Sequence, residues 1–264
     1  MSEESRKFWL FYLLLFLIIF DFFIFFYLSQ RSRHEFIFAT LDVGQGDALF
    51  IESPTGTQML VDGGPPKKIL SELSKVMSPF DKNIDAIMIT NPDQDHIGGF
   101  LDVLDVYDVE IAFLPGTLNE SKTFENLKLK LKEKNIPIVL AKKGMQFDLG
   151  GETRMDILFP DRDVSSWSTN DGSMVARLSF FNLGIMLTGD STLKTEKIIV
   201  NENKIEDLDS TILKVGHHGS RTSTGEAFLQ SVSPMFSIIS NGENNKYGHP
   251  HQEVLGVLES FESR

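Results

Sequence analysis

The apolar run from Phe8 to Leu28 limits what this chain can fold into more than any other feature. Asp21 is its only charged residue, and Trp9 and Tyr27 lie near its two ends. A run of about 20 apolar residues is long enough to cross a bilayer as a helix. Aromatic side chains near the ends of such a helix favour the membrane–water interface. The sequence therefore predicts a short tail over residues 1–7 and a transmembrane helix over residues 8–28.

A cleaved signal peptide is the alternative interpretation of this run. Signal peptides have a shorter apolar core and end in small residues, whereas this run ends in Tyr27-Leu28-Ser29-Gln30. Two basic residues flank each end, so charge alone does not set the orientation in the membrane. A membrane anchor is the preferred interpretation. We then expect a polar link over residues 29–35 and one domain over residues 36–264.

The remaining part of the chain, about 230 residues, is long enough for one large α/β domain. Its formal net charge of −12 disfavours a broad surface for nucleic acid, because such a surface repels phosphates. A metal-centred site that acts on phosphodiesters stays compatible with that charge. The absence of cysteine excludes disulfides, thiolate zinc sites and cysteine nucleophiles.

Apolar periodicity predicts two β-rich regions, each followed by helices. The predicted strands cover residues 36–43, 48–52, 58–61, 84–90, 111–114, 136–140, 155–159, 174–181, 185–188, 211–215 and 235–239. The predicted helices cover residues 67–77, 97–106, 122–134, 193–201, 225–231 and 252–261. This order predicts two sheets that pack on each other, with helices on the outer faces.

The polar motifs of the chain follow predicted strands. They are Asp62-Gly-Gly64, Asn91–Gly99, Asp190, His217-His218 and His249-Pro-His251. Of the 6 histidines, only His34 lies outside these loops. A single Asp–His pair is more simply a solvated loop, but carboxylates and imidazoles that gather at several strand ends are typical of a metal site.

Six motifs in this order resemble the metallo-β-lactamase-fold domain of ComEC-type competence proteins. They are Leu41–Asp47, Leu60–Gly64, Asn91–Gly99, Leu187–Asp190, Lys214–Ser220 and Tyr247–His251. The resemblance implies an αββα sandwich with one or two metal ions between the sheets. It also implies a metal-dependent nuclease outside the cytoplasmic membrane that degrades one DNA strand during uptake.

The resemblance assigns metal-binding roles to the first acidic motif. Asp95 and His96 correspond to the last two ligands of the His-x-His-x-Asp-His signature of the fold, and Asp93 stands at its second histidine. Asn91 stands at the first histidine, which is a departure from the signature. An amide oxygen can bind a hard cation but is a poor zinc ligand.

Further site residues are implied later in the chain. Asp190 corresponds to the acid that bridges two metals, His217 to a late metal ligand, and Asp62 to an acid that orients the ligand loop. Asn170 and Ser173 lie where many relatives of the wider fold carry another histidine. We expect these last two residues to contact substrate.

The implied ligand set is rich in oxygen and favours Mn²⁺ or Mg²⁺, with Zn²⁺ as the alternative. One or two such ions would bind a phosphate and activate a water that Asp95 holds. His249 or His218 would protonate the leaving oxygen. His249 or His251 is alternatively a metal ligand or a phosphate contact. Ser220 begins a segment that binds phosphate or caps the next helix.

Two features leave alternatives open. The basic segment Lys122–Lys143 could guide a nucleic-acid backbone, although a solvated helix face is preferred. ComEC-type proteins have many membrane spans and continue beyond the point that corresponds to Glu259–Arg264. The chain is therefore expected to be a fragment or a reduced stand-alone version.

Three functions are compatible with these features. The first is a membrane-anchored metal-dependent phosphodiesterase or nuclease that acts on DNA during competence, with DNA-uptake channel proteins as partners. The second is a hydrolase of the same fold that acts on a small ester, lactone or cyclic nucleotide. The third, motivated by Asn91, is a non-catalytic DNA-uptake subunit with a degenerate metal site.

Overall fold

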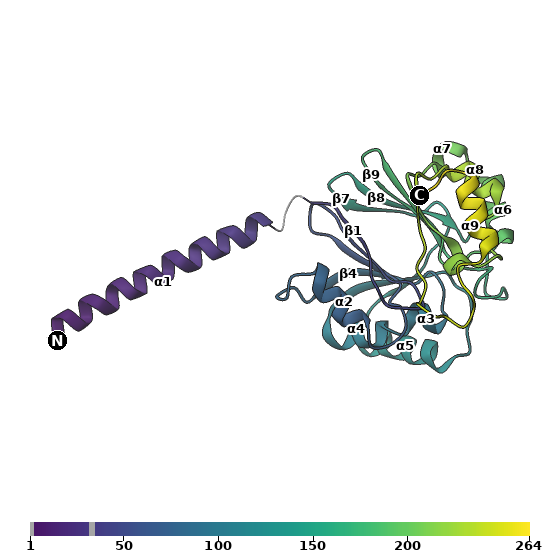
Figure 1. Cartoon of the computed structure of the whole chain (residues 1–264). Coiled ribbons are helices and arrows are strands. Elements are labelled where there is room, and N and C mark those ends of the chain that lie inside the picture. The colour runs from purple at the N-terminus through teal and green to yellow at the C-terminus, as the bar shows by residue number, and fades with distance from the viewer. Residues whose placement is uncertain (1–2, 32–34) are drawn as a thin grey trace.

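The computed structural model describes residues 3–31 and 35–264 of the chain. Figure 1 shows one long helix, α1 (Glu3–Arg31), beside a domain built from two sheets. The part of α1 from Glu3 to Tyr27 is long and apolar enough to cross a membrane, and its most apolar window is 0% buried. This helix agrees with the predicted transmembrane segment over residues 8–28.

The predicted link over residues 29–35 differs from the structure at its start. α1 continues as far as Arg31, beyond the end of the apolar run. A helix is held by hydrogen bonds between backbone groups, so it can extend into a polar sequence. Residues 32–34, which include His34, lie outside the described residues. The domain then begins with β1 (Ile37–Thr40).

Each sheet has 6 strands. The first has the order β1-β2-β3-β4-β5-β6, with β2 (Leu49–Glu52), β3 (Gln58–Val61), β4 (Asn83–Met88), β5 (Asp108–Leu114) and β6 (Ile138–Leu140). The second has the order β12-β11-β10-β9-β8-β7, with β7 (Gln146–Gly150), β8 (Thr153–Phe159), β9 (Val175–Phe180), β10 (Leu183–Leu187), β11 (Ile212–Lys214) and β12 (Phe236–Ile238). Neighbours are parallel from β3 to β6 and from β10 to β12, and antiparallel elsewhere.

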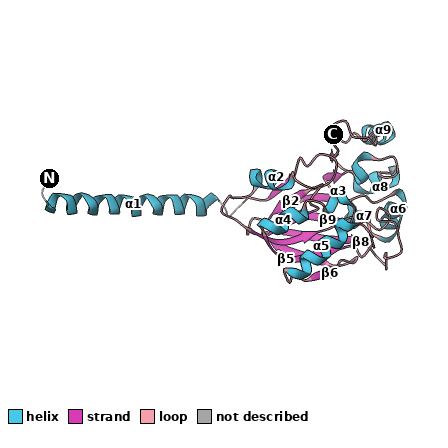
Figure 2. Cartoon of the chain, turned by 90° about the horizontal axis from the view of Figure 1, so that it is seen from below, coloured by secondary structure: helices cyan, strands magenta, loops and turns pink. Residues whose placement is uncertain are grey.

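Helices cover the outer face of each sheet (Figures 1 and 2). The first sheet is covered by α2 (Ile69–Val76), α4 (Phe100–Val106) and α5 (Lys122–Glu133). The second is covered by α6 (Leu193–Glu202), α7 (Ile205–Leu208), α8 (Glu226–Val232) and α9 (Gln252–Ser260). The predicted αββα sandwich is confirmed.

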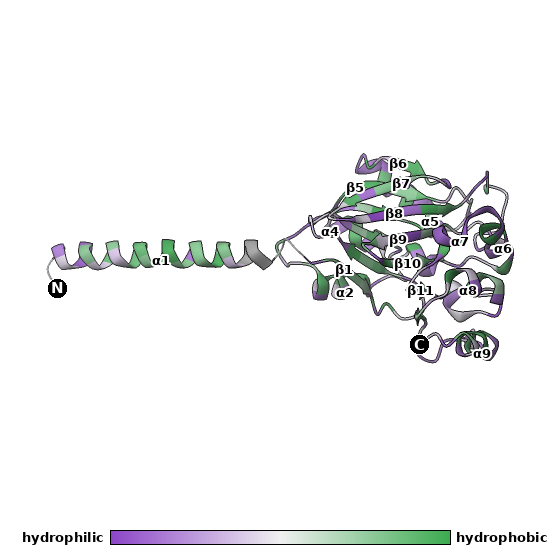
Figure 3. Ribbon diagram, turned by 90° about the horizontal axis from the view of Figure 1, so that it is seen from above, coloured by the Kyte–Doolittle hydropathy of each residue, from purple (hydrophilic) through white to green (hydrophobic). Residues whose placement is uncertain are grey.

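Alternation along the strands explains these four layers. Successive side chains of a strand point to opposite faces. In β2, Leu49 and Ile51 join the apolar cluster between the sheets, while Phe50 joins the cluster under the helices. A strand that is apolar on both faces needs other elements packed on both faces. Figure 3 shows hydrophobic residues on the strands and along α1.

β7 and α7 are among the elements that have no counterpart in the prediction. β7 is polar at every second position and ends at Gly150, and α7 has only 4 residues. Apolar periodicity becomes visible only over a longer window than either element provides.

Candidate metal centre

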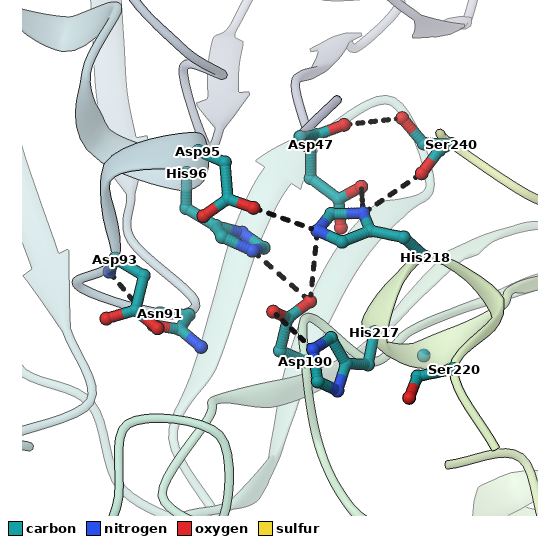
Figure 4. A network of polar contacts seen from close by, with 12 residues as sticks. Asp47, Asn91, Asp93, Asp95, His96, Asp190, His217, His218, Ser220 and Ser240 are labelled. Atoms are coloured by element: carbon teal, nitrogen blue, oxygen red, sulfur yellow. Dashed lines mark hydrogen bonds and ion pairs between the residues drawn. The ribbon is translucent and has the colours of Figure 1, made fainter. Parts of the chain in front are cut away.

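Strand ends of both sheets meet at one edge of the sandwich and carry its polar cluster (Figure 4). Asp62 follows β3, and His96 lies in α3 (Gln94–Ile97) after β4. Asp190 follows β10, and His218 lies in the 3₁₀ turn η1 (Gly216–Gly219) after β11. Asp47 precedes β2, but β2 runs antiparallel to β3, so its start lies at the same edge.

Asp62 holds the imidazole of His96 in place. Oδ2 of Asp62 accepts hydrogen bonds from Nδ1 of His96 at 2.9 Å and from Oγ1 of Thr90 at 2.5 Å. The backbone N–H of Thr90 donates to Oδ1 of Asp62 at 2.8 Å. Nδ1 of His96 is bonded to Asp62, so the opposite ring nitrogen, Nε2, points toward Asp190. A carboxylate behind an imidazole in this way fixes the orientation of metal-binding histidines.

Four side chains converge on one point in front of His96 (Figure 4). Nε2 of His96 lies 3.2 Å from Oδ1 of Asp190, and Nε2 of His218 lies 3.6 Å from the same oxygen. Nε2 of His218 also lies 3.4 Å from Oδ2 of Asp95. Ligands that are each about 2.1 Å from one metal ion are roughly 3 to 4 Å apart. The observed distances therefore suit one ion at the centre of the four.

The hydrogen bonding of these atoms tests whether a metal fits. Nε2 of His96, Nε2 of His218 and Oδ1 of Asp190 are buried and have no hydrogen-bond partner within residues 3–31 and 35–264. Buried polar atoms without a partner cost free energy. Imidazole nitrogens and carboxylate oxygens are ordinary ligands for divalent metals, and one ion would satisfy all three atoms. The residues present thus fit a divalent metal ion.

The charges in this cluster depend on one another. Burial opposes ionisation of Asp190, but His96 and His218 outweigh it and hold the pKa of this carboxyl below its usual range. Burial also opposes protonation of His218, yet Asp190 and Asp47 raise the pKa of this imidazole to about 10. Protons on the imidazoles thus balance the carboxylates when no cation does so. A divalent ion would replace these protons, so its binding should release them.

Asp47 connects the cluster to the second sheet. Its Oδ1 lies 3.3 Å from Nδ1 of His218, and that nitrogen donates a hydrogen bond to the backbone oxygen of Ser240 at 2.9 Å. Asp47 is absent from the sequence-predicted site residues because it precedes a strand instead of following one. The preceding turn, Gly44-Gln-Gly46, is the sequence signal that could have identified it.

The backbone of η1 directs His218, rather than His217, into the cluster. Both residues have left-handed φ angles, 46° and 55° in chain order, which residues other than glycine rarely adopt. The side chain of His217 is 23% exposed, and its Nε2 lies 3.8 Å from Oδ2 of Asp190. The prediction that His217 is the late ligand therefore stays a prediction. The buried His218 lies among the converging atoms, and His217 lies beside it.

Asn91 lies outside the group of converging ligands, in contrast to the prediction that it binds metal. It is fully buried, and its amide is hydrogen-bonded to the backbone of Asp93 and to the side chains of Asn170 and Ser173. Asp93 faces the site, but both of its carboxylate oxygens accept hydrogen bonds from neighbouring side chains.

A cavity of about 200 Å³ opens beside the converging ligands. Its lining residues are Gln45, Asp93, Asp95, Asn170, Asp190, His217, His218, Tyr247 and His249. Burial, and then the imidazoles of His217, His251 and His218, lower the pKa of His249 to about 4. The ring of Tyr247 stacks on that of His249, with centroids 5.6 Å apart. Gln45 and Tyr247 carry no predicted role, although both belong to motifs that resemble the family.

Three predicted substrate contacts are not among the described residues that line this cavity. Ser173 lies behind Asn91, as described above. Oγ of Ser220 lies 3.0 Å from Oγ1 of Thr222. Nδ1 of His251 accepts a hydrogen bond from the backbone N–H of Arg221 at 3.2 Å, and His251 immediately precedes α9.

The alternative role of the Ser220 segment as a helix cap is wrong. Gly225 immediately precedes α8, with no side-chain cap. The carboxylate of Glu196 accepts the backbone N–H groups of Thr224 at 2.5 Å and Gly225 at 2.8 Å instead. The sequence near Thr224 gives no sign of this contact, because Glu196 comes from α6, 28 residues earlier.

Comparison with protein families matches residues 41–240 to the metallo-β-lactamase superfamily. The chain belongs to this superfamily. Its members share a metal-dependent hydrolase fold, which agrees with the cluster of Asp95, His96 and His218.

Two curated relatives match most of this chain. ComE operon protein 3 of Bacillus subtilis is 33% identical over 242 residues, which is 85% of this chain and 30% of that protein. Recombination protein 2 of Haemophilus influenzae is 28% identical over 240 residues, which is 89% of this chain and 28% of that protein. The chain thus spans less than a third of the length of either relative.

Solved structures of the superfamily share the fold. The metallo-β-lactamase fold protein YhfI of Bacillus subtilis superposes with a TM-score of 0.53 at 13% identity, over 83% of this chain and 92% of that one. The metallo hydrolase Igni18 of Ignicoccus hospitalis gives a TM-score of 0.53 at 14% identity, over 86% and 94%.

Proposed function

We propose that this chain is a membrane-anchored, metal-dependent phosphodiesterase that cleaves DNA. The observation that carries the proposal is the convergence of Asp95, His96, Asp190 and His218 beside an open cavity. The resemblance of the chain to ComEC-type competence proteins supports DNA as the substrate. A divalent ion held by these residues would supply positive charge to a phosphate and acidify water. It would also offset the net charge of −12, which otherwise repels DNA.

The residues around the cavity have distinct roles in this proposal. Asp95, with a side chain 32% exposed, holds the attacking water and accepts its proton. His217 and His249 line the cavity and donate hydrogen bonds to phosphate oxygens. The lowered pKa of His249 favours a role as phosphate contact over a role as proton donor at neutral pH. His218 faces two carboxylates from a buried position, which suits a ligand better than an acid.

The identity of the ion and the cellular location also belong to the proposal. The ligand set contains carboxylates and imidazoles and no thiolate, so Mn²⁺ or Mg²⁺ is preferred, with Zn²⁺ as the alternative. The apolar part of α1 supports anchoring in a membrane. By resemblance to competence proteins, the domain would lie outside the cytoplasmic membrane and work with DNA-uptake channel proteins.

A cleavage assay on the full chain in detergent micelles tests the proposal. The protein is incubated with single- and double-stranded DNA, with Mn²⁺ or with a chelator. We expect Mn²⁺-dependent cleavage, and Asp95→Asn should slow it by roughly 10²-fold or more. Asp102→Asn, in α4, is the matched control because Asp102 contacts Lys67 away from the cavity. Absence of cleavage with Mn²⁺, or cleavage that survives in Asp95→Asn, would contradict the proposal.

A hydrolase of a small ester, lactone or cyclic nucleotide is the second candidate. The cavity of about 200 Å³ favours it, since it can enclose only a small molecule. The same protein is tested against a panel of such substrates. Turnover of a small substrate without cleavage of DNA would select this candidate over the first.

A further inference from the structure

The two metal positions of the fold signature differ sharply in this chain. One is surrounded by the converging atoms of His96, Asp190, His218 and Asp95. The other would be formed by Asn91 and Asp93, which replace the first two signature histidines. We infer that the chain binds a single divalent ion at the first of these positions, and that a hydrogen-bond network around Asn91 replaces the second ion.

The orientation of the Asn91 amide is fixed by its neighbours. The backbone N–H of Asp93 lies 2.9 Å from Oδ1 of Asn91. A backbone N–H can only donate, so the atom that faces it must be the amide oxygen. The amide nitrogen therefore points the other way, where it donates to Oδ1 of Asn170 at 2.9 Å and to Oγ of Ser173 at 3.2 Å. A cation beside this nitrogen would face hydrogens instead of a lone pair.

Asp93 is engaged in the same network. Its Oδ1 accepts a hydrogen bond from Nδ2 of Asn119 at 2.7 Å, and its Oδ2 accepts one from Oγ1 of Thr169 at 2.9 Å. Oγ of Ser173 donates to the backbone oxygen of Thr169 at 3.1 Å, which closes the loop over Asn91.

The atoms at the two positions show the contrast most clearly. At the first position, Nε2 of His96, Nε2 of His218 and Oδ1 of Asp190 are buried and lack hydrogen-bond partners among the described residues. At the second, the polar side-chain atoms of Asn91 and Asp93 have partners within the protein. A buried polar atom without a partner is costly and calls for a ligand, whereas a satisfied one does not. Only the first position therefore needs a metal ion.

A single ion changes which residues contact a phosphate substrate. A second ion would bind a phosphate oxygen from the Asn91 side of the cavity. In its absence, polar side chains of the lining, Asn170 and His217 among them, are the available contacts. The inference thus rests on the metal centre of the proposed function but not on DNA as the substrate.

Metal analysis of the full chain in detergent tests the inference. The protein is stripped with a chelator, reloaded with excess Mn²⁺ and separated from free metal. We expect one Mn²⁺ per chain and the electron paramagnetic resonance spectrum of an isolated ion. Two tightly bound ions per chain with the spectrum of a spin-coupled pair would overturn the inference.

Two variants make the test specific to each position. His96→Ala should lose the single ion, and one ion retained in this variant would reveal a second site and overturn the inference. Asn91→Ser removes the amide, and the stoichiometry should stay at one with less than a threefold change in Mn²⁺ affinity. A loss of tenfold or more in folded Asn91→Ser would show that Asn91 is a ligand. One ion per chain without DNA cleavage would support the inference while contradicting the proposed function.

Discussion

Nζ of Lys214 lies 2.8 Å from Oδ2 of Asp47, and the two side chains are 1% and 2% exposed. Lys214 ends β11 in the second sheet, and Asp47 precedes β2 in the first. Burial opposes ionisation of Asp47, but Lys214 and then His218 hold its pKa below the usual range. This ion pair therefore joins the two sheets at the edge that carries the metal centre.

Removing the ammonium of this pair should destabilise the fold strongly. Lys214→Met leaves the carboxylate of Asp47 buried without its main partner, which typically costs about 3–5 kcal/mol. Urea unfolding of the full chain in detergent, with a chelator present, measures this loss. Lys75→Met is the matched control, because the side chain of Lys75 is 64% exposed and its pair with Glu72 on the surface is worth at most about 1 kcal/mol. Equal losses in the two variants would contradict this prediction.

Close approach of two backbones makes Gly99 hard to replace. A Cβ at Gly99 would lie 2.1 Å from the backbone oxygen of Gly63. The N–H of Gly99 donates to the oxygen of Gly64, and the N–H of Gly63 donates to that of His96. Gly99→Ala should therefore separate the loop of Asp62 from that of His96 and cost about 1–3 kcal/mol.

Gly256→Ala is the control for the substitution at Gly99. Gly256 lies in α9, and a Cβ there would have no neighbour within 4 Å. Alanine in a helix interior should stabilise by about 0.5–1 kcal/mol. Thermal unfolding followed by circular dichroism distinguishes the destabilisation expected at Gly99 from the stabilisation expected at Gly256. Equal stability of the two variants would refute the close contact at Gly99.

Much of the fold and part of the site follow from local sequence. Val61 and Leu187 end apolar strands, so Asp62 and Asp190 could be placed at strand ends before any contact was known. Their convergence follows from the parallel strands of each sheet, whose carboxyl ends meet at one edge.

The remaining features of the site depend on contacts between distant segments. Asp47 reaches the site only because β2 is antiparallel to β3. The choice of His218 over His217 depends on two left-handed residues in succession, which sequence periodicity does not encode. The pairing of Asn91 with Asn170 spans 79 residues, so a local motif cannot show that the amide is already engaged.

The hydrogen bond from His96 to Asp62 should contribute to metal affinity. Asp62→Asn replaces an accepting oxygen by an amide, so Nδ1 of His96 loses part of its support. Loss of such a partner typically weakens metal binding by about 10–100-fold. Calorimetric titration of the metal-free full chain with Mn²⁺ measures the change. Asp102→Asn should leave the affinity within about twofold, since Asp102 lies away from the centre. Unchanged affinity in Asp62→Asn would show that Asp62 does not position His96 for a metal.

The stability of the domain should fall as pH rises because of Glu196. Burial raises the pKa of Glu196 from 4.5 to about 7, although the N–H groups of Gly225 and Thr224 oppose this. Between these values the folded state keeps a proton that the unfolded state has released. Stability is therefore lost as pH increases from about 4.5 to 7, by on the order of 3 kcal/mol in total. Glu196→Gln cannot ionise, so its unfolding free energy relative to the unmodified chain should rise by that amount between about pH 4.5 and 8. Urea unfolding of both proteins across this range, with a chelator present, measures the difference in unfolding free energy. A difference independent of pH would show that Glu196 is already ionised in the folded state at pH 5.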